Sequence, residues 1–300
     1  MENKKRKRTN KRTNNRDDSD NDDMDIDDEE QIGLDAMPNS ELVNVEFTFS
    51  NIVEENFESI RNLIKPLFEY EDINPSDLFD VMLSQHEDVG TTIKSENDVF
   101  AVYSYVPLSF YKNQPQHNRF IDKFYTLIKL KLKENTVLTD DLKQRAISII
   151  DNNNLNVGLV VNERAFNMPQ ETVPPAFELI TKEIGECKEF DEYDKRYDFD
   201  YVIVMSKFVK IIQDESKKRS NKMQKGDNTL GQGKDNVAYY KFEMPLFIKE
   251  SEVSLEYKIP YNMKNMEYLE NKNEPQYVSI AILKAENYFR ILKNQLHCDI

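Results

Sequence analysis

The chain has 300 residues, an apolar fraction of 39 % and a formal net charge of −15 at pH 7. The length allows one large domain or two small ones, and no stretch approaches the about eighteen consecutive apolar residues of a membrane helix. The negative charge disfavours general binding to nucleic acids, because phosphate contacts require a basic surface. It fits a binder of basic proteins or an acidity that serves only solubility, and composition leaves both open.

The compartment is indicated by the cysteines and the N-terminus. Cys187 and Cys298 are the only cysteines, which is too few for a disulfide framework. The first residues read MENKKRKRTNKR and lack the apolar segment of a secretory signal. A nuclear or cytosolic location is therefore expected.

Residues 1–38 form a tail whose two halves carry opposite charge. The first half contains a compact basic run that is a candidate nuclear-localisation signal, made of Lys4, Lys5, Arg6, Lys7 and Arg8. The alternative is a solvated tail with weak polyanion contacts. Residues 17–35 are rich in acids and contain no Lys or Arg. Blocks of like charge cannot bury apolar surface, so the tail is predicted to be disordered.

Residues 39–300 are predicted to form a single domain with a disordered insertion at about 214–236, where the chain is polar and has no apolar period. The first half alternates apolar and polar residues at 43–49, which predicts a strand with Val43, Val45, Phe47 and Phe49 inward. Helices are predicted at 54–70, from Asn74 onward, and at 120–132 and 142–150. Strands are predicted at 89–93 and 99–106.

The second half continues with a buried strand at 157–161 and a helix at 174–184. Further strands are predicted at 199–212, 239–248, 253–259 and 277–283, and a final helix at 284–296. Strands and helices are mixed but do not alternate strictly. This order predicts an α/β (α+β) fold with a mixed sheet flanked by helices.

The common catalytic and metal-binding motifs are missing. No glycine-rich phosphate loop and no Gly-x-Ser-x-Gly nucleophile turn occurs in the chain. The three histidines, His86, His117 and His297, lie far apart and without metal-ligand spacing. We therefore predict no catalytic residue, no metal and no cofactor.

The most distinctive stretch is VGLVVNERAFNMPQETVPP, residues 157–175. Glu163 and Arg164 follow a buried strand, where they could perform general acid–base chemistry. The alternative is an internal ion pair, with Asn167 bonding the loop backbone ahead of Pro169. We favour this structural interpretation, because buried polar groups require partners. The structural signature comprises Gly158, Glu163, Arg164, Asn167 and Pro169.

Two acidic segments are candidates for partner binding. The first comprises Glu69, Glu71, Asp72, Asp77 and Asp80, and the second comprises Glu186, Glu189, Asp191, Glu192 and Asp194. Aromatic residues are interleaved with the second set. Acidic and aromatic side chains together suit a partner face made of Arg and Lys. The alternative for the first set is a solvated helix face.

The same stretches resemble the BCCIP family of eukaryotic nuclear proteins, which includes fungal members. The resemblance rests on five segments in order and covers roughly residues 40–297. These are the strand at 43–49, the Ile-x-x-Leu-Ile-x-x-Leu-Phe rhythm of 60–68, the Val-Gly-Thr-Thr-Ile-Lys run of 89–94, the signature at 158–169, and the Lys-rich insertion.

The resemblance implies a fold like that of the Gcn5-related N-acetyltransferases. Those enzymes hold acetyl-CoA on a glycine-rich loop after a central strand. The corresponding loop here, NERAFNMPQ, contains no glycine, and Arg164, Phe166 and Met168 are expected to crowd the phosphates. The cofactor is therefore expected to have been lost.

The family further implies a non-enzymatic nuclear chaperone or adaptor that shuttles to the cytoplasm. Its expected partner is a basic large-subunit ribosomal protein, with roles in ribosome biogenesis, nuclear export and protein transport. Nuclear transport receptors, and cell-cycle and DNA-repair regulators known for relatives, are further expected partners. Direct nucleic-acid and membrane binding are not expected. The alternative is a divergent acetyl-CoA-dependent N-acetyltransferase.

Overall fold

The computed structural model describes residues 45–85, 88–190, 195–210, 231–233, 237–260 and 275–300. They belong to one compact unit, Val45–Ile300. Residues 1–44 and most of the insertion lie outside the described residues, so the predicted disorder of both stays a prediction. Within the insertion, only Gly231–Gly233 are described, and they form a short strand. In the part of the chain that is described, no helix is long and apolar enough to cross a membrane.

Nine strands in the described residues form one mixed sheet. They are β1 (Thr48–Asn51), β2 (Thr91–Ser95), β3 (Asp98–Pro107), β4 (Val157–Arg164), β5 (Tyr201–Lys210), β6 (Gly231–Gly233), β7 (Val237–Tyr239), β8 (Val253–Lys258) and β9 (Gln276–Lys284). β1 to β4 are antiparallel neighbours, and β4 is parallel to β5. Beyond β5 the sheet forks, because β5 pairs with both β9 and β7. β8 extends the β9 branch, and β6 extends the β7 branch.

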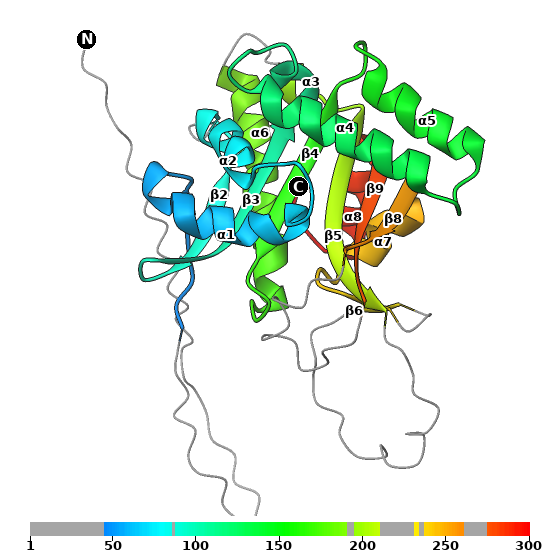
Figure 1. Cartoon of the computed structure of the whole chain (residues 1–300). Helices are drawn as coiled ribbons and strands as arrows, with labels where there is room; N and C mark the ends of the chain where they lie inside the picture. Colours follow the sequence, from blue (N-terminus) through cyan, green and yellow to red (C-terminus); the bar gives the residue numbers. More distant parts are fainter. Residues whose placement is uncertain (1–44, 86–87, 191–194, 211–230, 234–236, 261–274) are drawn as a thin grey trace, which may run out of the picture. The chain divides into compact units, whose positions relative to one another are not determined.

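Helices cover both faces of this sheet (Figure 1). One face carries α1 (Phe57–Phe68), α2 (Pro75–Ser84), α4 (Asn118–Glu134) and α5 (Asp140–Asp151) around one apolar core. The other carries α6 (Val173–Phe190), α7 (Met244–Glu250) and α8 (Ala285–Gln295) around a second core. The short helix α3 (Leu108–Tyr111) follows β3, and 3₁₀ turns precede α1 (Glu54–Asn56), α6 (Gln170–Thr172) and β5 (Lys195–Tyr197). The predicted fold class is confirmed.

Most predicted elements are present because local sequence signals agree with apolar spacing. The Asn74 side chain accepts a hydrogen bond from the Ser76 amide and caps α2, as Asn-Pro at a helix start predicts. Thr139 caps α5 in the same way. In α1, α2, α4 and α8, the apolar residues that repeat at helical spacing are mostly buried.

Two predictions were wrong in part. Residues 43 and 44 lie outside the described residues, residues 45–47 are not in a strand, and β1 begins at Thr48. Val45 and Phe49 are exposed although both were predicted to be inward. β1 pairs only with β2, so it lies at the edge of the sheet. The strand predicted at 239–248 is instead the end of β7 followed by α7. Pro245 lies in the first turn of α7, where a missing amide is tolerated, and Phe247 stacks on Tyr288.

Gly158 has a packing role in β4. A Cβ atom built on Gly158 would lie 2.7–2.9 Å from three atoms of the Phe199 ring. These distances are shorter than real Cβ contacts allow, so the ring reaches the strand only because residue 158 has no side chain. The ring in turn packs against Tyr105 and Tyr197. Glycine at this signature position is therefore explained by contact with an aromatic ring.

We expect Gly158→Ala to destabilise the chain by about 1–3 kcal/mol, because the methyl group displaces the Phe199 ring. Chemical unfolding monitored by circular dichroism measures this loss. Phe199→Leu should remove most of the clash, so Gly158→Ala should cost less in that background than in the wild type. Equal costs in the two backgrounds would contradict this role for Gly158.

Candidate functional site

The signature stretch ends where β4 and β5 separate. The two strands pair in parallel only over Val157–Val160 and Tyr201–Val204. Past these residues β4 continues beside β3, and β5 continues beside β9 and β7. Figure 1 shows the two strands moving apart toward their ends. A gap between parallel strands at their carboxyl ends is a common ligand-binding site in α/β proteins. The residues that line or fill this gap therefore decide whether a ligand has room to bind there.

Lys241 fills the gap and joins the two strands. Its Nζ donates hydrogen bonds to Asn162 Oδ1 at 2.7 Å and to Glu163 Oε1, both on β4. The third hydrogen bond goes to the Met205 carbonyl oxygen on β5, at 2.7 Å. A lysine ammonium has three N–H donors, and all three are used here. Lys241 is buried, so these contacts replace those of bulk water.

Glu243 forms the second half of this cluster. Its carboxylate is fully buried and accepts two hydrogen bonds from the Arg164 guanidinium, at 2.7 and 2.8 Å. Asn162 Nδ2 donates a further bond to Glu243 Oε1 at 2.9 Å. Paired parallel bonds between arginine and a carboxylate are among the strongest charge-assisted contacts in proteins. Asn162 therefore links the Lys241–Glu163 pair to the Glu243–Arg164 pair.

The cluster contains two cations and two anions and is neutral as a whole. Burial lowers the pKa of Lys241, an effect that Glu163 opposes. For Glu243, burial acts to raise the pKa, but the adjacent Arg164 outweighs it and holds the pKa below its ordinary value. The pKa of Arg164 is raised because the attraction of Glu243 exceeds the cost of burial. The cluster is thus built to hold charges in fixed pairs, and this arrangement is typical of structural ion pairs.

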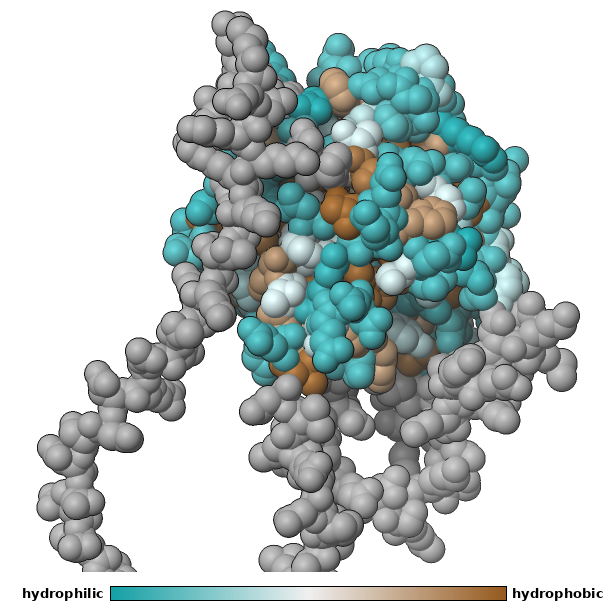
Figure 2. Space-filling view, turned by 90° about the vertical axis from the view of Figure 1, so that its left-hand side faces the viewer, coloured by the Kyte–Doolittle hydropathy of each residue, from teal (hydrophilic) through white to brown (hydrophobic). Residues whose placement is uncertain are grey.

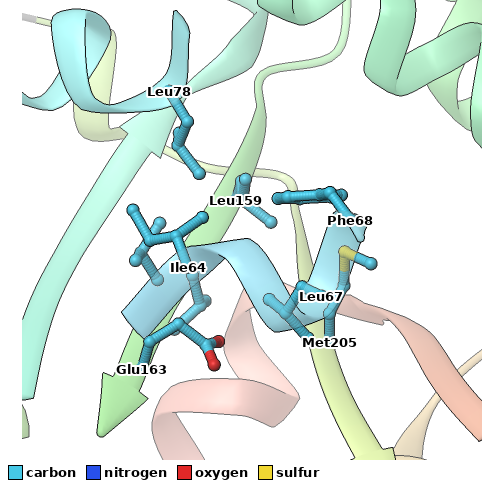
Figure 3. Close-up of a pocket in the computed structure, with 9 residues that line it drawn as sticks. Ile64, Leu67, Phe68, Leu78, Leu159, Glu163 and Met205 are labelled. Carbon is cyan, nitrogen blue, oxygen red and sulfur yellow. The ribbon is translucent and has the colours of Figure 1, made fainter. Parts of the chain in front are cut away.

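The other side of the gap is closed by apolar packing. Helix α1 packs over β4 and β5, and the remaining cavity has a volume of about 10 Å³. Figure 3 shows Ile64, Leu67 and Phe68 of α1 facing Leu159 and Met205, with Glu163 at the margin. A cavity of this size holds about one water molecule. No volume comparable to a cofactor is left between the strands in this part of the described structure.

The loop after β4 differs in detail from the prediction. Arg164 and Met168 turn into the protein, so neither crowds an external phosphate site. Phe166 is 64 % exposed and lies against the Tyr240 ring at 5.8 Å. The loop is closed by backbone bonds from Ala165 to Phe100 and from Met168 to Ala165, and Asn167 is exposed. Glu163 and Arg164 form internal ion pairs, but with residues other than those predicted: Glu163 pairs with Lys241 and Arg164 with Glu243.

Sequence reasoning missed Lys241 and Glu243, although they carry the cluster. Both lie in the run Tyr-Tyr-Lys-Phe-Glu-Met, which was predicted to be part of a strand at 239–248. The available signal was two charges inside a strongly apolar segment. Such charges require buried partners, and Glu163 and Arg164 are the complementary pair.

The first acidic segment is partly neutralised by α4. Glu71 pairs with Lys131 at 2.9 Å, Asp72 with Lys123 at 2.9 Å, and Asp77 with Arg119 at 3.3 Å. These three basic residues follow one side of α4. Glu71 is only 11 % exposed, whereas the Asp72 side chain is 95 % exposed and Asp80 is exposed.

Glu69, Asp72 and Asp80 are thus the exposed members of this segment, and Glu69 already has an interaction within the chain. Figure 2, which views the molecule from the left-hand side of Figure 1, shows a largely hydrophilic face with small, separate hydrophobic groups. Among the residues drawn in colour, this view shows no broad apolar area.

The remaining predicted residues are only partly placed. Glu186 is half-buried on α6 and has an interaction there. The side chain of Glu189 and residues Asp191, Glu192 and Asp194 lie outside the described residues, as do Lys4, Lys5, Arg6, Lys7 and Arg8. Their roles stay predictions. Among the residues that the structure describes, no group of three or more His, Cys, Asp or Glu side chains could hold a metal ion.

Comparison with known proteins places this arrangement in a family. The BCCIP family model matches residues 42–247, which include the signature stretch, Lys241 and Glu243. The chain belongs to the BCCIP family. The predicted family membership is therefore confirmed.

Two fungal relatives illustrate the match of this BCCIP-family chain. Protein BCP1 of Debaryomyces hansenii is 31 % identical over 181 residues, which is 57 % of each of the two proteins. Protein BCP1 of Saccharomyces cerevisiae is 28 % identical over 223 residues, or 72 % of each. Both relatives bear family names and neither is named as an enzyme.

The solved structure of a relative agrees with this fold. The crystal structure of BCP1 from Saccharomyces cerevisiae superposes with a TM-score of 0.55 at 20 % identity, covering 86 % of this chain and 90 % of that one. A polyamine N-acetyltransferase from Drosophila melanogaster gives a TM-score of 0.36 at 8 % identity, covering 80 % of this chain and all of the enzyme. The latter score is too low to carry an argument about activity.

Glu243→Gln should destabilise this BCCIP-family chain by about 3–5 kcal/mol at pH 7, because it leaves the buried Arg164 without a counter-charge. The folded-state pKa of Glu243 lies below its ordinary value of 4.5. Its contribution to stability is therefore complete above that value and is lost as the pH falls toward the lowered one. The difference between wild type and variant should shrink below about pH 4.5. Urea unfolding at a series of pH values measures both effects.

Glu250→Gln provides the matched control. Glu250 pairs with Arg290 at 2.7 Å, but the two side chains are 27 % and 55 % exposed. Loss of such a surface pair costs under about 1 kcal/mol. If Glu243→Gln were no more costly than Glu250→Gln, the cluster would not hold the strand ends together.

Proposed function

We propose that this chain is a non-enzymatic nuclear chaperone or adaptor that binds a basic large-subunit ribosomal protein through acidic surfaces. In this role it supports ribosome biogenesis, nuclear export and protein transport. Nuclear transport receptors recognise its basic N-terminal run, and cell-cycle and DNA-repair regulators are further partners. The observation that carries the non-enzymatic half of the proposal is the filled gap between β4 and β5.

The filled gap supports a non-enzymatic role through energetics. A cofactor entering between the strands would displace Lys241 and Glu243 from their partners. Breaking one buried pair alone costs about 3–5 kcal/mol, because the partner charge stays in the interior. A ligand would have to recover that energy before gaining any affinity. Family membership supports the same conclusion, since the relatives bear no enzyme names.

The charge distribution supports a basic partner. The chain has 55 acidic and 40 basic residues. Exposed ion pairs such as Asp72–Lys123 contribute only about 0–1 kcal/mol, so a basic partner can compete for the carboxylate. Complementary charge also speeds association and makes it sensitive to salt. The exposed carboxylates of Asp72 and Asp80 are therefore assigned to the partner surface.

The double variant Asp72→Asn/Asp80→Asn tests this surface. Affinity for at least one of a panel of purified basic large-subunit ribosomal proteins should fall about three- to tenfold, and binding should become less sensitive to salt. Fluorescence anisotropy titrations at low and physiological salt measure both quantities. Glu71 is left intact, because its replacement would break the semi-buried pair with Lys131 and disturb the fold.

Glu134→Gln/Asp140→Asn is the control with the same change in net charge. Both residues are exposed, at the far end of α4 and the start of α5. Its affinity should stay close to that of the wild type. If both double variants lost the same affinity, the effect would come from net charge and not from the surface at Asp72 and Asp80. If no protein of the panel bound the chain, the proposed function would be refuted.

A further inference from the structure

A groove of about 470 Å³ lies between α6 and α8, apart from the buried cluster and from the first acidic segment. It belongs to the second apolar core, on the sheet face opposite α1, α2 and α4. Its lining includes Ile184 and Gly185 of α6, Tyr197, and Phe289, Arg290 and Lys293 of α8. A groove of this volume between two helices accommodates one or two large side chains of a partner.

Gly185 lines the groove and lies inside α6, more than one turn before the end of the helix. Glycine is less favourable than alanine at such a position, because it loses more conformational freedom on folding. A Cβ atom built on Gly185 meets no atom within 4 Å. Internal packing in the described structure therefore does not require glycine here, unlike at Gly158. The missing side chain instead leaves open space over the helix.

The walls of the groove are apolar and its charged members are basic. Ile184 and Tyr197 are buried beneath it, and Phe289 and Ile300 are half-buried at its side. Arg290 and Lys293 are the charged side chains among the described lining residues. Both are exposed on α8, where Arg290 bonds Glu250 at 2.7 Å and Lys293 bonds the Ile300 carbonyl oxygen at 3.2 Å. The charged side chains that line the groove are therefore basic, although the chain as a whole has a formal net charge of −15.

We propose that this groove binds an acidic segment of a partner protein, which inserts an aliphatic or aromatic side chain over Gly185. Carboxylates of that segment face Arg290 and Lys293. A basic segment would meet like charges here, so charge complementarity selects the acidic occupant. This groove prefers an acidic partner, whereas the surface at Asp72 and Asp80 prefers a basic one. The proposal for the groove does not depend on the proposed function.

A displayed library of random peptides of about twelve residues, selected on the full chain, tests the proposal. Enriched peptides should be acidic and carry a large apolar residue. Gly185→Leu and Lys293→Glu should each weaken binding of a synthetic enriched peptide by about tenfold or more in anisotropy titrations. Gly185→Ala should weaken it less, while raising the melting temperature of the chain.

Lys249→Glu is the matched control, because Lys249 is exposed on the neighbouring helix α7 and does not line the groove. It should leave the affinity unchanged. The proposal would be overturned if the selection enriched only basic peptides or no peptides. It would also be overturned if the enriched acidic peptides bound Gly185→Leu as tightly as the wild type. Self-association of the chain that Gly185→Leu abolishes would also overturn it, by placing a second copy in the groove.

Discussion

The neutral cluster of Lys241, Glu163, Asn162, Glu243 and Arg164 is the interaction on which the centre of this structure depends. Two parallel strands part at their carboxyl ends and expose polar groups to the interior. Each buried charge would be costly alone, and the five side chains satisfy one another with short, directed bonds. The segment that supplies Lys241 and Glu243 also connects β7 to α7. One local set of charge pairs therefore fixes the fork of the sheet and the position of a helix on its second face.

This arrangement determines where function can reside. The gap at the strand ends is filled by charged side chains on one side and by α1 on the other, with a residual cavity of about 10 Å³. The side chains at the centre of the sheet therefore stabilise the fold. In the functions proposed above, recognition uses the outer surfaces, which differ between the two faces: paired and exposed carboxylates beside α4, and an apolar groove with basic residues between α6 and α8. Two surfaces of opposite preference suit an adaptor that holds two partners at once.

The sequence predicted the fold class and most elements because their signals are local. Asn74-Pro75 starts α2, and the stripes of α1, α4 and α8 repeat at helical spacing. Sequence reasoning failed where tertiary contacts decide. The run around Lys241 alternates like a strand, but its charges are buried by residues about eighty positions earlier in the chain, as the spacing of 78 and 79 residues to Glu163 and Arg164 shows. The sequence indicated the acidic residues near Asp72, but it could not indicate their basic partners on α4. Ion pairs between helices depend on how the helices pack, which the sequence does not show.

Thermal unfolding of the full chain with increasing acetyl-CoA tests most directly whether the strand ends are structural. The filled gap predicts that the melting temperature stays constant at all concentrations, since the described strand ends leave no room for the cofactor. A specific ligand at about one hundred times its dissociation constant would stabilise the folded state by about 2.7 kcal/mol and raise the melting temperature. A saturable rise that persists in the variant Lys293→Glu, and so does not arise from the groove between α6 and α8, would show that Lys241 and Glu243 yield their positions to a cofactor. That result would contradict a purely structural role for the cluster.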